Sequence, residues 1–164
     1  MDKHSVAQAI KTYADKKPNL TVDEGTITWQ VSHVWLAGGL KAYYSSIEDF
    51  YLNTIFNCSH YESGYVDQVP WLERVNLPNW CQGLRIEPAN IEQVQRELED
   101  GLNEALENEP EEEFDAENFK VDGVIERAWS ISESTEPRTA LGGHWAFLFE
   151  TRDTFFYLER NWES

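Results

Sequence analysis

Residues 144–150 (HWAFLFE) and 154–160 (TFFYLER) give the strongest fold signal in the chain. Both stretches are rich in aromatic side chains, which favour β-strands, and Asp153 suits a tight turn between them. The first stretch is apolar at consecutive positions, so both of its faces are apolar. That pattern indicates a central strand covered on both sides. We therefore expect an antiparallel hairpin in the middle of a sheet.

The segments that precede this hairpin add helices and further strands. Apolar residues recur at helical spacing in three segments, which are 3–17, about 45–57 and 90–108. Two more segments have strand patterns, which are 26–31 (TITWQV) and 124–132 (VIERAWSIS). These patterns predict a single α+β domain over residues 1–164, with about three helices on an antiparallel sheet of about three or four strands. Its C-terminal strands lie within 124–162.

Three local features refine this prediction. Ser45 and Glu48 have the spacing of a capping box at the start of the second helix. The pairs Gly38–Gly39 and Gly142–Gly143 indicate turns. Residues 58–89 contain repeated prolines and glycines and indicate a long ordered loop with short pieces of structure, a kind of segment that often has a function.

Composition indicates a packed domain in the cytosol. The chain has 164 residues, of which 41% are apolar and 13% aromatic, more than a disordered chain carries. Its two cysteines are too few for a secreted disulfide framework. The first seventeen residues lack the apolar core of a signal peptide, and no run of about 18 apolar residues occurs. We expect a cytoplasmic protein, of a bacterium or of a virus-infected host cell, that binds no membrane.

The net charge excludes several kinds of partner. The chain has 30 acidic and 13 basic residues, for a formal net charge of −17. Such a field repels nucleic acids and anionic membranes and attracts cationic surfaces. Direct phosphate binding requires clustered lysine or arginine, and the sequence has no such cluster. We therefore expect no direct binding of nucleic acid.

The acidic residues are concentrated in helix 90–108 and the linker that follows it to residue 117. Residues 92–117 contain twelve acids but only Arg96 as a base, so eleven of the seventeen net negative charges lie here. Apolar residues of the helix fall on one side, and acids fill the other. Neighbouring acids such as Glu97 and Asp100 destabilise a helix by about 0.2–0.5 kcal/mol per pair. Solubility alone needs a net charge of only about 2–8 in magnitude.

Three interpretations of this surface stay open: a solvated helix face with an acidic linker, an adaptation to high salt, and a contact surface for a basic partner. Salt adaptation predicts acids over the whole surface, and the clustering argues against it. We take the contact surface as the working hypothesis. Its candidate residues are Glu92, Glu97, Glu99, Asp100, Glu104, Glu107, Glu111, Glu112 and Glu113, with Trp71 and Trp80 from the long loop as exposed aromatic anchors.

The hypothesis predicts a non-enzymatic inhibitor that occludes a nucleic-acid-binding protein or nuclease, as DNA mimics of the anti-restriction, anti-defence or immunity type do. A helix of about 18 residues is about 27 Å long. DNA of that length carries about 16 charges, against six acids on the outer side of this helix. Mimicry therefore needs additional acids beside the helix, from the linker, from elsewhere in the chain or from a homodimer.

The alternative is an enzyme. Residues 142–161 (GGHWAFLFETRDTFFYLERN) resemble the histidine-bearing strands of papain-like amidases. That resemblance implies a thiol hydrolase in which Cys58 or Cys81 is the nucleophile and His144 its base. Cys58, His60 and Cys81 lack the spacing of a zinc site. No nucleotide-binding glycine motif occurs, and we expect no metal and no cofactor.

Overall fold

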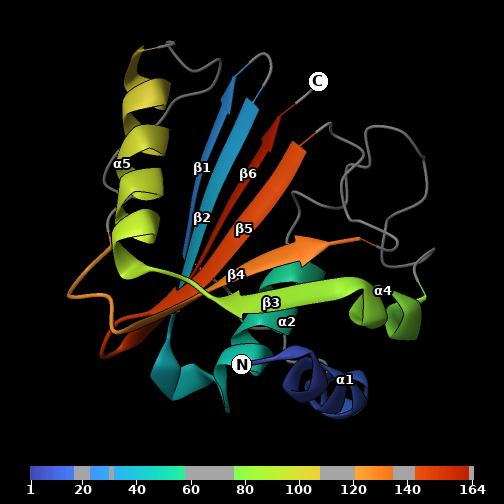
Figure 1. The fold of residues 1–164 in the computed structure, drawn as a ribbon. Helices are drawn as coiled ribbons and strands as arrows, with labels where there is room; N and C mark the ends of the chain where they lie inside the picture. The colour runs from blue at the N-terminus through green and yellow to red at the C-terminus, as the bar shows by residue number, and fades with distance from the viewer. Residues whose placement is uncertain (17–22, 30–31, 58–75, 108–120, 135–142, 163–164) are drawn as a thin grey trace.

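One antiparallel sheet organises the chain (Figure 1). The computed structural model describes residues 1–16, 23–29, 32–57, 76–107, 121–134 and 143–162. The sheet has six strands in the order β1-β2-β6-β5-β4-β3. They are β1 (Asp23–Trp29), β2 (Ser32–Leu40), β3 (Leu84–Pro88), β4 (Arg127–Glu133), β5 (Gly143–Glu150) and β6 (Thr154–Trp162). The predicted α+β class is confirmed, whereas the predicted strand number was too low.

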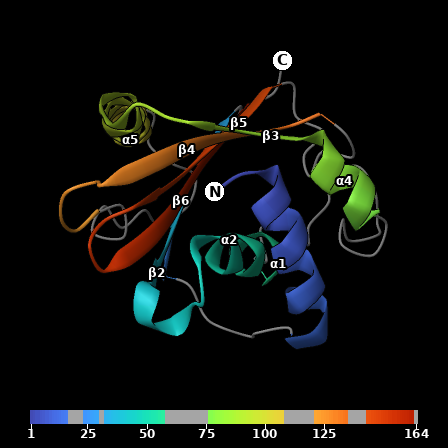
Figure 2. The same ribbon diagram turned by 60° about the horizontal axis from the view of Figure 1, so that its bottom comes forward.

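Helices cover both faces of the sheet (Figure 2). They are α1 (Lys3–Lys16), α2 (Ile47–Asn57), α4 (Leu77–Gly83) and α5 (Ile91–Glu107), with the short 3-10 helix η1 (Lys41–Tyr43). The first three α-helices lie on one face, and α5 lies on the other. The domain therefore has two separate apolar layers, one on each side of the sheet.

The hairpin expected at the C-terminus forms the middle of the sheet. β5 pairs with β6 and β4, and the hairpin closes where Thr151 N donates to Thr154 O at 3.0 Å. Because side chains of a strand alternate between faces, Phe147 packs in the layer under α5 and Leu148 packs in the layer under α1 and α2. The prediction of a central strand covered on both sides is confirmed.

Gly38 and Gly39 lie inside β2, so the prediction of a turn at this pair was wrong. Aromatic rings pack closely on the strand at these two positions, so a side chain at either position would crowd them. A Cβ atom on Gly39 would lie 2.7 Å from Tyr44 Cε2, and one on Gly38 would lie 3.2 Å from Phe156 Cε1. The glycines therefore permit close packing on a strand.

Part of the predicted loop 58–89 is regular structure. Asn76 caps α4 by accepting a hydrogen bond from Asn79 N at 3.1 Å, and Pro78 occupies the first turn. β3 follows directly, as an edge strand of five residues that ends at Pro88. Proline is tolerated at a strand end on a sheet edge. The rest of that predicted loop, 58–75, lies outside the described residues.

Helix caps define where α2 and α5 begin. Ser46, not Ser45, caps α2, because its Oγ accepts from Asp49 N at 3.1 Å. The predicted capping box was therefore one residue out of place. Asn90 Oδ1 accepts from Glu92 N at 2.8 Å and caps α5.

The apolar side of α5 packs on the sheet as predicted. Val94 is fully buried, and Gly101 lies against Val34 of β2. Three further residues of the helix are half-buried in the same layer, which are Ile91, Leu98 and Leu102. The opposite side of α5 therefore faces solvent, and one flank of the helix faces the neighbouring strands.

Candidate functional site

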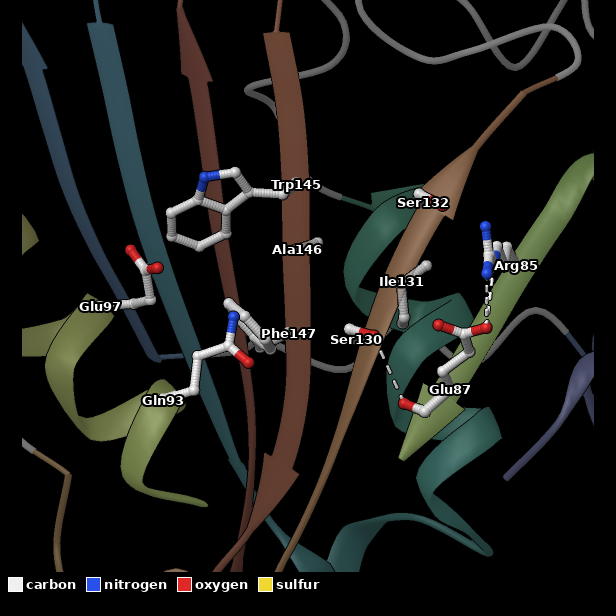
Figure 3. A pocket seen from close by; sticks show the side chains of 10 residues that line it. All are labelled: Arg85, Glu87, Gln93, Glu97, Ser130, Ile131, Ser132, Trp145, Ala146 and Phe147. Atoms are coloured by element: carbon white, nitrogen blue, oxygen red, sulfur yellow. Dashed lines mark hydrogen bonds and ion pairs between the residues drawn. The ribbon is translucent and has the colours of Figure 1, made fainter. Parts of the chain in front are cut away.

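A groove of about 370 Å³ lies between α5 and strands β3, β4 and β5 (Figure 3). Its lining comes from regular elements: two residues four apart on α5, two residues two apart on β3, and three consecutive residues on each of β4 and β5. The residues that line it are Arg85, Glu87, Gln93, Glu97, Ser130, Ile131, Ser132, Trp145, Ala146 and Phe147. Sites built on helices and strands hold their side chains at fixed positions.

Two aromatic residues of β5 form the floor of the groove. Trp145 and Phe147 share the face of the sheet that carries α5. Their ring centroids are 5.2 Å apart at an interplanar angle of 60°, an edge-to-face contact. Phe147 is buried, whereas Trp145 is only half-buried, so the indole is the aromatic surface that a ligand meets.

Polar side chains form the wall on the side of α5. Gln93 and Glu97 lie one turn apart on the helix, and both line the groove. Figure 3 shows the Glu97 carboxylate and the Trp145 indole directed toward one another across the groove. The wall therefore presents a carboxylate and an amide above an aromatic floor.

The opposite wall is internally neutralised. Arg85 and Glu87 of β3 form an ion pair in which Arg85 Nη2 lies 2.9 Å from Glu87 Oε1. Both side chains are mostly exposed, so the pair contributes little to stability. Ser130 and Ser132 of β4 lie between this pair and the floor (Figure 3). The net charge of the groove lining therefore comes from Glu97.

The environment of Glu97 favours its protonated form. Burial raises the pKa of this carboxyl above its usual value of 4.5, and Asp100 adds to the rise. Arg160 of β6 and Arg96 oppose it. Among the residues that the structure describes, the carboxylate has no hydrogen-bond or ion-pair partner. Glu97 is thus a half-buried acid without a counterion in contact.

The predicted acidic contact residues of α5 separate into two groups. Four are exposed on the solvent side: Glu92, Glu99, Asp100 and Glu107. Glu97 is half-buried and lines the groove instead. Glu104 lies in the helix, but its side chain is outside the described part of the chain, as are Glu111, Glu112, Glu113 and Trp71. The helix therefore carries both an exposed acidic face and one wall of a groove.

The prediction that Trp80 is an exposed anchor was wrong. Its side chain is fully buried and contacts the rings of Tyr51 and Phe56 of α2, with centroid distances of 6.3 and 6.1 Å. The reason is that α4 packs this residue into the layer shared with α1 and α2. Its aromatic surface stabilises the core and is not available to a partner.

Cys81 does not have the environment of a nucleophile. It is buried on α4, where its Sγ donates to the Lys3 carbonyl at 3.7 Å. Burial raises the pKa of this thiol, whereas reactive cysteines have a lowered pKa. Cys58 and the side chain of His144 lie outside the described residues.

Two buried carboxylates lie away from the groove lining. Glu150 pairs with Arg127 Nε at 2.6 Å and with Lys41 Nζ at 3.5 Å, and so joins β4, β5 and η1. Glu159 is fully buried in β6 and accepts a hydrogen bond from the Tyr157 hydroxyl. Both carboxylates have partners within the chain, which explains how the domain tolerates them.

Comparison with protein-family models, curated proteins and solved structures gives no match for this chain. Within the described ranges, no group of three or more metal-ligating side chains is placed to hold an ion. In the same part of the chain, no helix has the length and apolar character needed to cross a bilayer.

The groove was not predicted from the sequence, because its residues come from four separate segments. A strand covered on both sides implies that its aromatic residues belong to the core, which is correct for Phe147 but incomplete for Trp145. The signal in the sequence that could have found the groove is strand alternation. It places Trp145 and Phe147 on the same face of one strand, and Ser130 and Ser132 on the same face of another. Which part of that face α5 leaves uncovered depends on how the helix packs.

Proposed function

We propose that this chain is a non-enzymatic interaction protein that occludes a basic, nucleic-acid-binding surface of a partner protein. The observation that carries the proposal is the solvent side of α5, where Glu92, Glu99, Asp100 and Glu107 are all exposed. A net charge of −17 adds long-range attraction for a cationic surface. Association is then fast and weakens as salt is added.

The packing of α5 supports this role, because it fixes the acids on a rigid element. Val94 is fully buried, and the helix approaches β2 closely at Gly101. The backbone that carries the four exposed acids is thus already ordered before a partner binds. Such preorganisation lowers the entropy lost on association.

The partner's binding groups are lysine and arginine side chains that otherwise hold phosphates. An α-helix of 17 residues is about 25 Å long, and DNA of that length carries about 15 charges. The four exposed acids of α5 supply about a quarter of that number. The DNA-mimic form of the proposal needs further acids beside these, and Glu111, Glu112 and Glu113, which follow the helix in the sequence, are the candidates.

The test is a pull-down with a charge-reversed helix. The variant Glu92→Lys/Glu99→Lys/Asp100→Lys changes only exposed side chains, so we expect it to stay folded. The wild-type chain should retain a basic nucleic-acid-binding protein at about 50 mM salt and lose much of it at about 500 mM. The variant should not retain it, and a DNA duplex should compete with the wild-type chain for the captured protein.

Equal retention by the variant would contradict the proposal. Retention of a partner together with its bound DNA would contradict occlusion. The circular dichroism spectrum of the variant should match that of the wild-type chain, so that a loss of binding is not a loss of fold.

A further inference from the structure

We propose that the groove beside α5 binds an arginine side chain of the basic partner, with the guanidinium stacked on Trp145 and paired with Glu97. This inference rests on the proposed function for the statement that the partner is a basic protein. It adds the chemical group that is recognised and the residues that recognise it. Neither Trp145 nor the strand residues of the groove belong to the exposed acidic face of α5.

The first step of the argument concerns Glu97. Its carboxylate is half-buried, points into the groove and has no ion-pair partner among the described residues. Burial raises the pKa of Glu97, and the negative charge of Asp100 raises it further. Arg160 and Arg96 lower the pKa, but they offset the rise only in part. A carboxylate that has lost water and has no counterion gains more from an arriving cation than an exposed one does.

The second step concerns Trp145. The indole is half-buried on the floor, and its edge-to-face contact with Phe147, at 5.2 Å between centroids, supports it from one side. Tryptophan is the most favourable aromatic partner for a cation that lies over its face. Because a guanidinium is planar, it can stack on the ring and still direct its N–H groups toward a carboxylate at the side. Figure 3 shows Glu97 in that lateral position.

The third step concerns the remaining polar groups. A guanidinium has five N–H donors, and a carboxylate satisfies only some of them. Gln93, Ser130 and Ser132 add neutral acceptors around the same floor. Arg85 does not compete as a cation, because Glu87 pairs with it at 2.9 Å. The lining thus offers one net negative charge and several uncharged acceptors, which matches one arginine.

The size of the groove agrees with this assignment. Pockets for small molecules and cofactors have volumes of about 300–1,000 Å³. At about 370 Å³ the groove is at the lower end of that range. This volume has room for one long side chain with its flanking backbone.

The experiment uses three capped amino acids with side chains of similar size. N-acetyl-arginine methylamide is the test probe, the lysine analogue carries the same charge as an ammonium, and the citrulline analogue is an uncharged match for arginine. Each is titrated into the full ¹⁵N-labelled chain at about 50 mM salt. The indole N–H signal of Trp145 is assigned with the variant Trp145→Phe. We expect the arginine probe to shift this signal and the amides of Gln93 and Glu97, with a Kd of about 1 mM.

The lysine probe should bind several-fold more weakly, and the citrulline probe should cause no shift in the same range. Glu97→Gln should weaken arginine binding about tenfold, whereas Glu99→Gln removes the same charge from the exposed side of α5 and should change it less than about twofold. Both variants should keep a dispersed spectrum, which confirms that they are folded.

Three results would overturn the inference: no shift of the Trp145 signal by the arginine probe, equal shifts by arginine and citrulline, or equal loss of binding in Glu97→Gln and Glu99→Gln. Binding of lysine as tight as that of arginine would overturn the assignment to a guanidinium. None of these results bears on the charge-reversed helix, because Glu92, Glu99 and Asp100 do not line the groove. If the charge-reversed variant loses the partner and the arginine probe does not bind the groove, only the groove assignment fails.

Discussion

Gly101 of α5 lies against Val34 of β2, so closely that a Cβ atom on the glycine would be 3.2 Å from Val34 Cγ1. A glycine within a helix costs about 1 kcal/mol relative to alanine. Its presence here is explained by the distance between helix and sheet. The close approach of α5 to β2 sets the position of the helix, and with it the positions of the exposed acids and of the groove wall.

Gly101→Leu should therefore destabilise the fold by about 1–3 kcal/mol, because the added side chain has to push the helix away from Val34. The measurement is urea unfolding followed by tryptophan fluorescence. Asn103→Leu makes a comparable change at an exposed position of the same helix and should alter the stability by less than about 0.5 kcal/mol. Equal effects in the two variants would show that the close approach at Gly101 is unimportant.

Tyr157→Phe should destabilise the domain through a buried carboxylate. The Tyr157 hydroxyl donates to Glu159, which is fully buried. Removal of one partner of a buried hydrogen bond costs about 1–3 kcal/mol. Tyr43→Phe is the control, because Tyr43 is 65% exposed. A denaturation midpoint for Tyr157→Phe equal to that of Tyr43→Phe would contradict this assignment.

Glu97→Gln should change the pH dependence of stability. Burial raises the pKa of Glu97 in the folded chain above 4.5, so the folded state binds this proton more tightly than the unfolded state does. The stability that the bound proton contributes is complete below 4.5 and is lost as the pH rises through the folded pKa. The variant should therefore unfold at higher temperature than the wild-type chain at about pH 7 but not at about pH 3.5.

Thermal unfolding at the two pH values tests this, with Glu99→Gln as the control for loss of one charge on the same helix. The charges that act on Glu97 are Arg160, Arg96 and Asp100, and both variants retain them. An equal difference from wild type at both pH values would contradict a raised pKa at Glu97.

Cys81 should react with a thiol reagent only when the chain unfolds. Its Sγ is buried and donates to the Lys3 carbonyl, and burial raises its pKa. In a Cys58→Ala variant, labelling with a disulfide reagent should be slow in buffer and fast in denaturant. Fast labelling of the folded variant would restore Cys81 as a candidate nucleophile of a thiol hydrolase.

The segments predicted most accurately from the sequence are those with regular side-chain patterns. The hairpin of β5 and β6 and the helix α5 were placed within one or two residues, because alternation and helical spacing are local properties. β2 was missed because Gly38 and Gly39 break the strand pattern. The two glycines make room for the rings of Phe156 and Tyr44, and the sequence does not show that these rings pack on them.

The site was predicted less completely than the fold. The acids of α5 follow from helical spacing, and four of them are exposed as expected. Trp80 was placed on the surface although α4 buries it, because that short helix and β3 were interpreted as a loop. The groove depends on which strands are neighbours in the sheet, and that is a long-range property of the chain.

The most direct test of the proposed function compares two triple reversals of equal charge. One is Glu92→Lys/Glu99→Lys/Asp100→Lys on α5, and the other reverses three exposed acids elsewhere, namely Asp122, Glu126 and Asp153. Retention of the basic partner is measured for both variants at about 50 mM salt. If α5 is the interface, the helix variant loses the partner and the second variant keeps most of it. Equal losses would show that total charge, not the face of α5, attracts the partner, and would contradict the proposal.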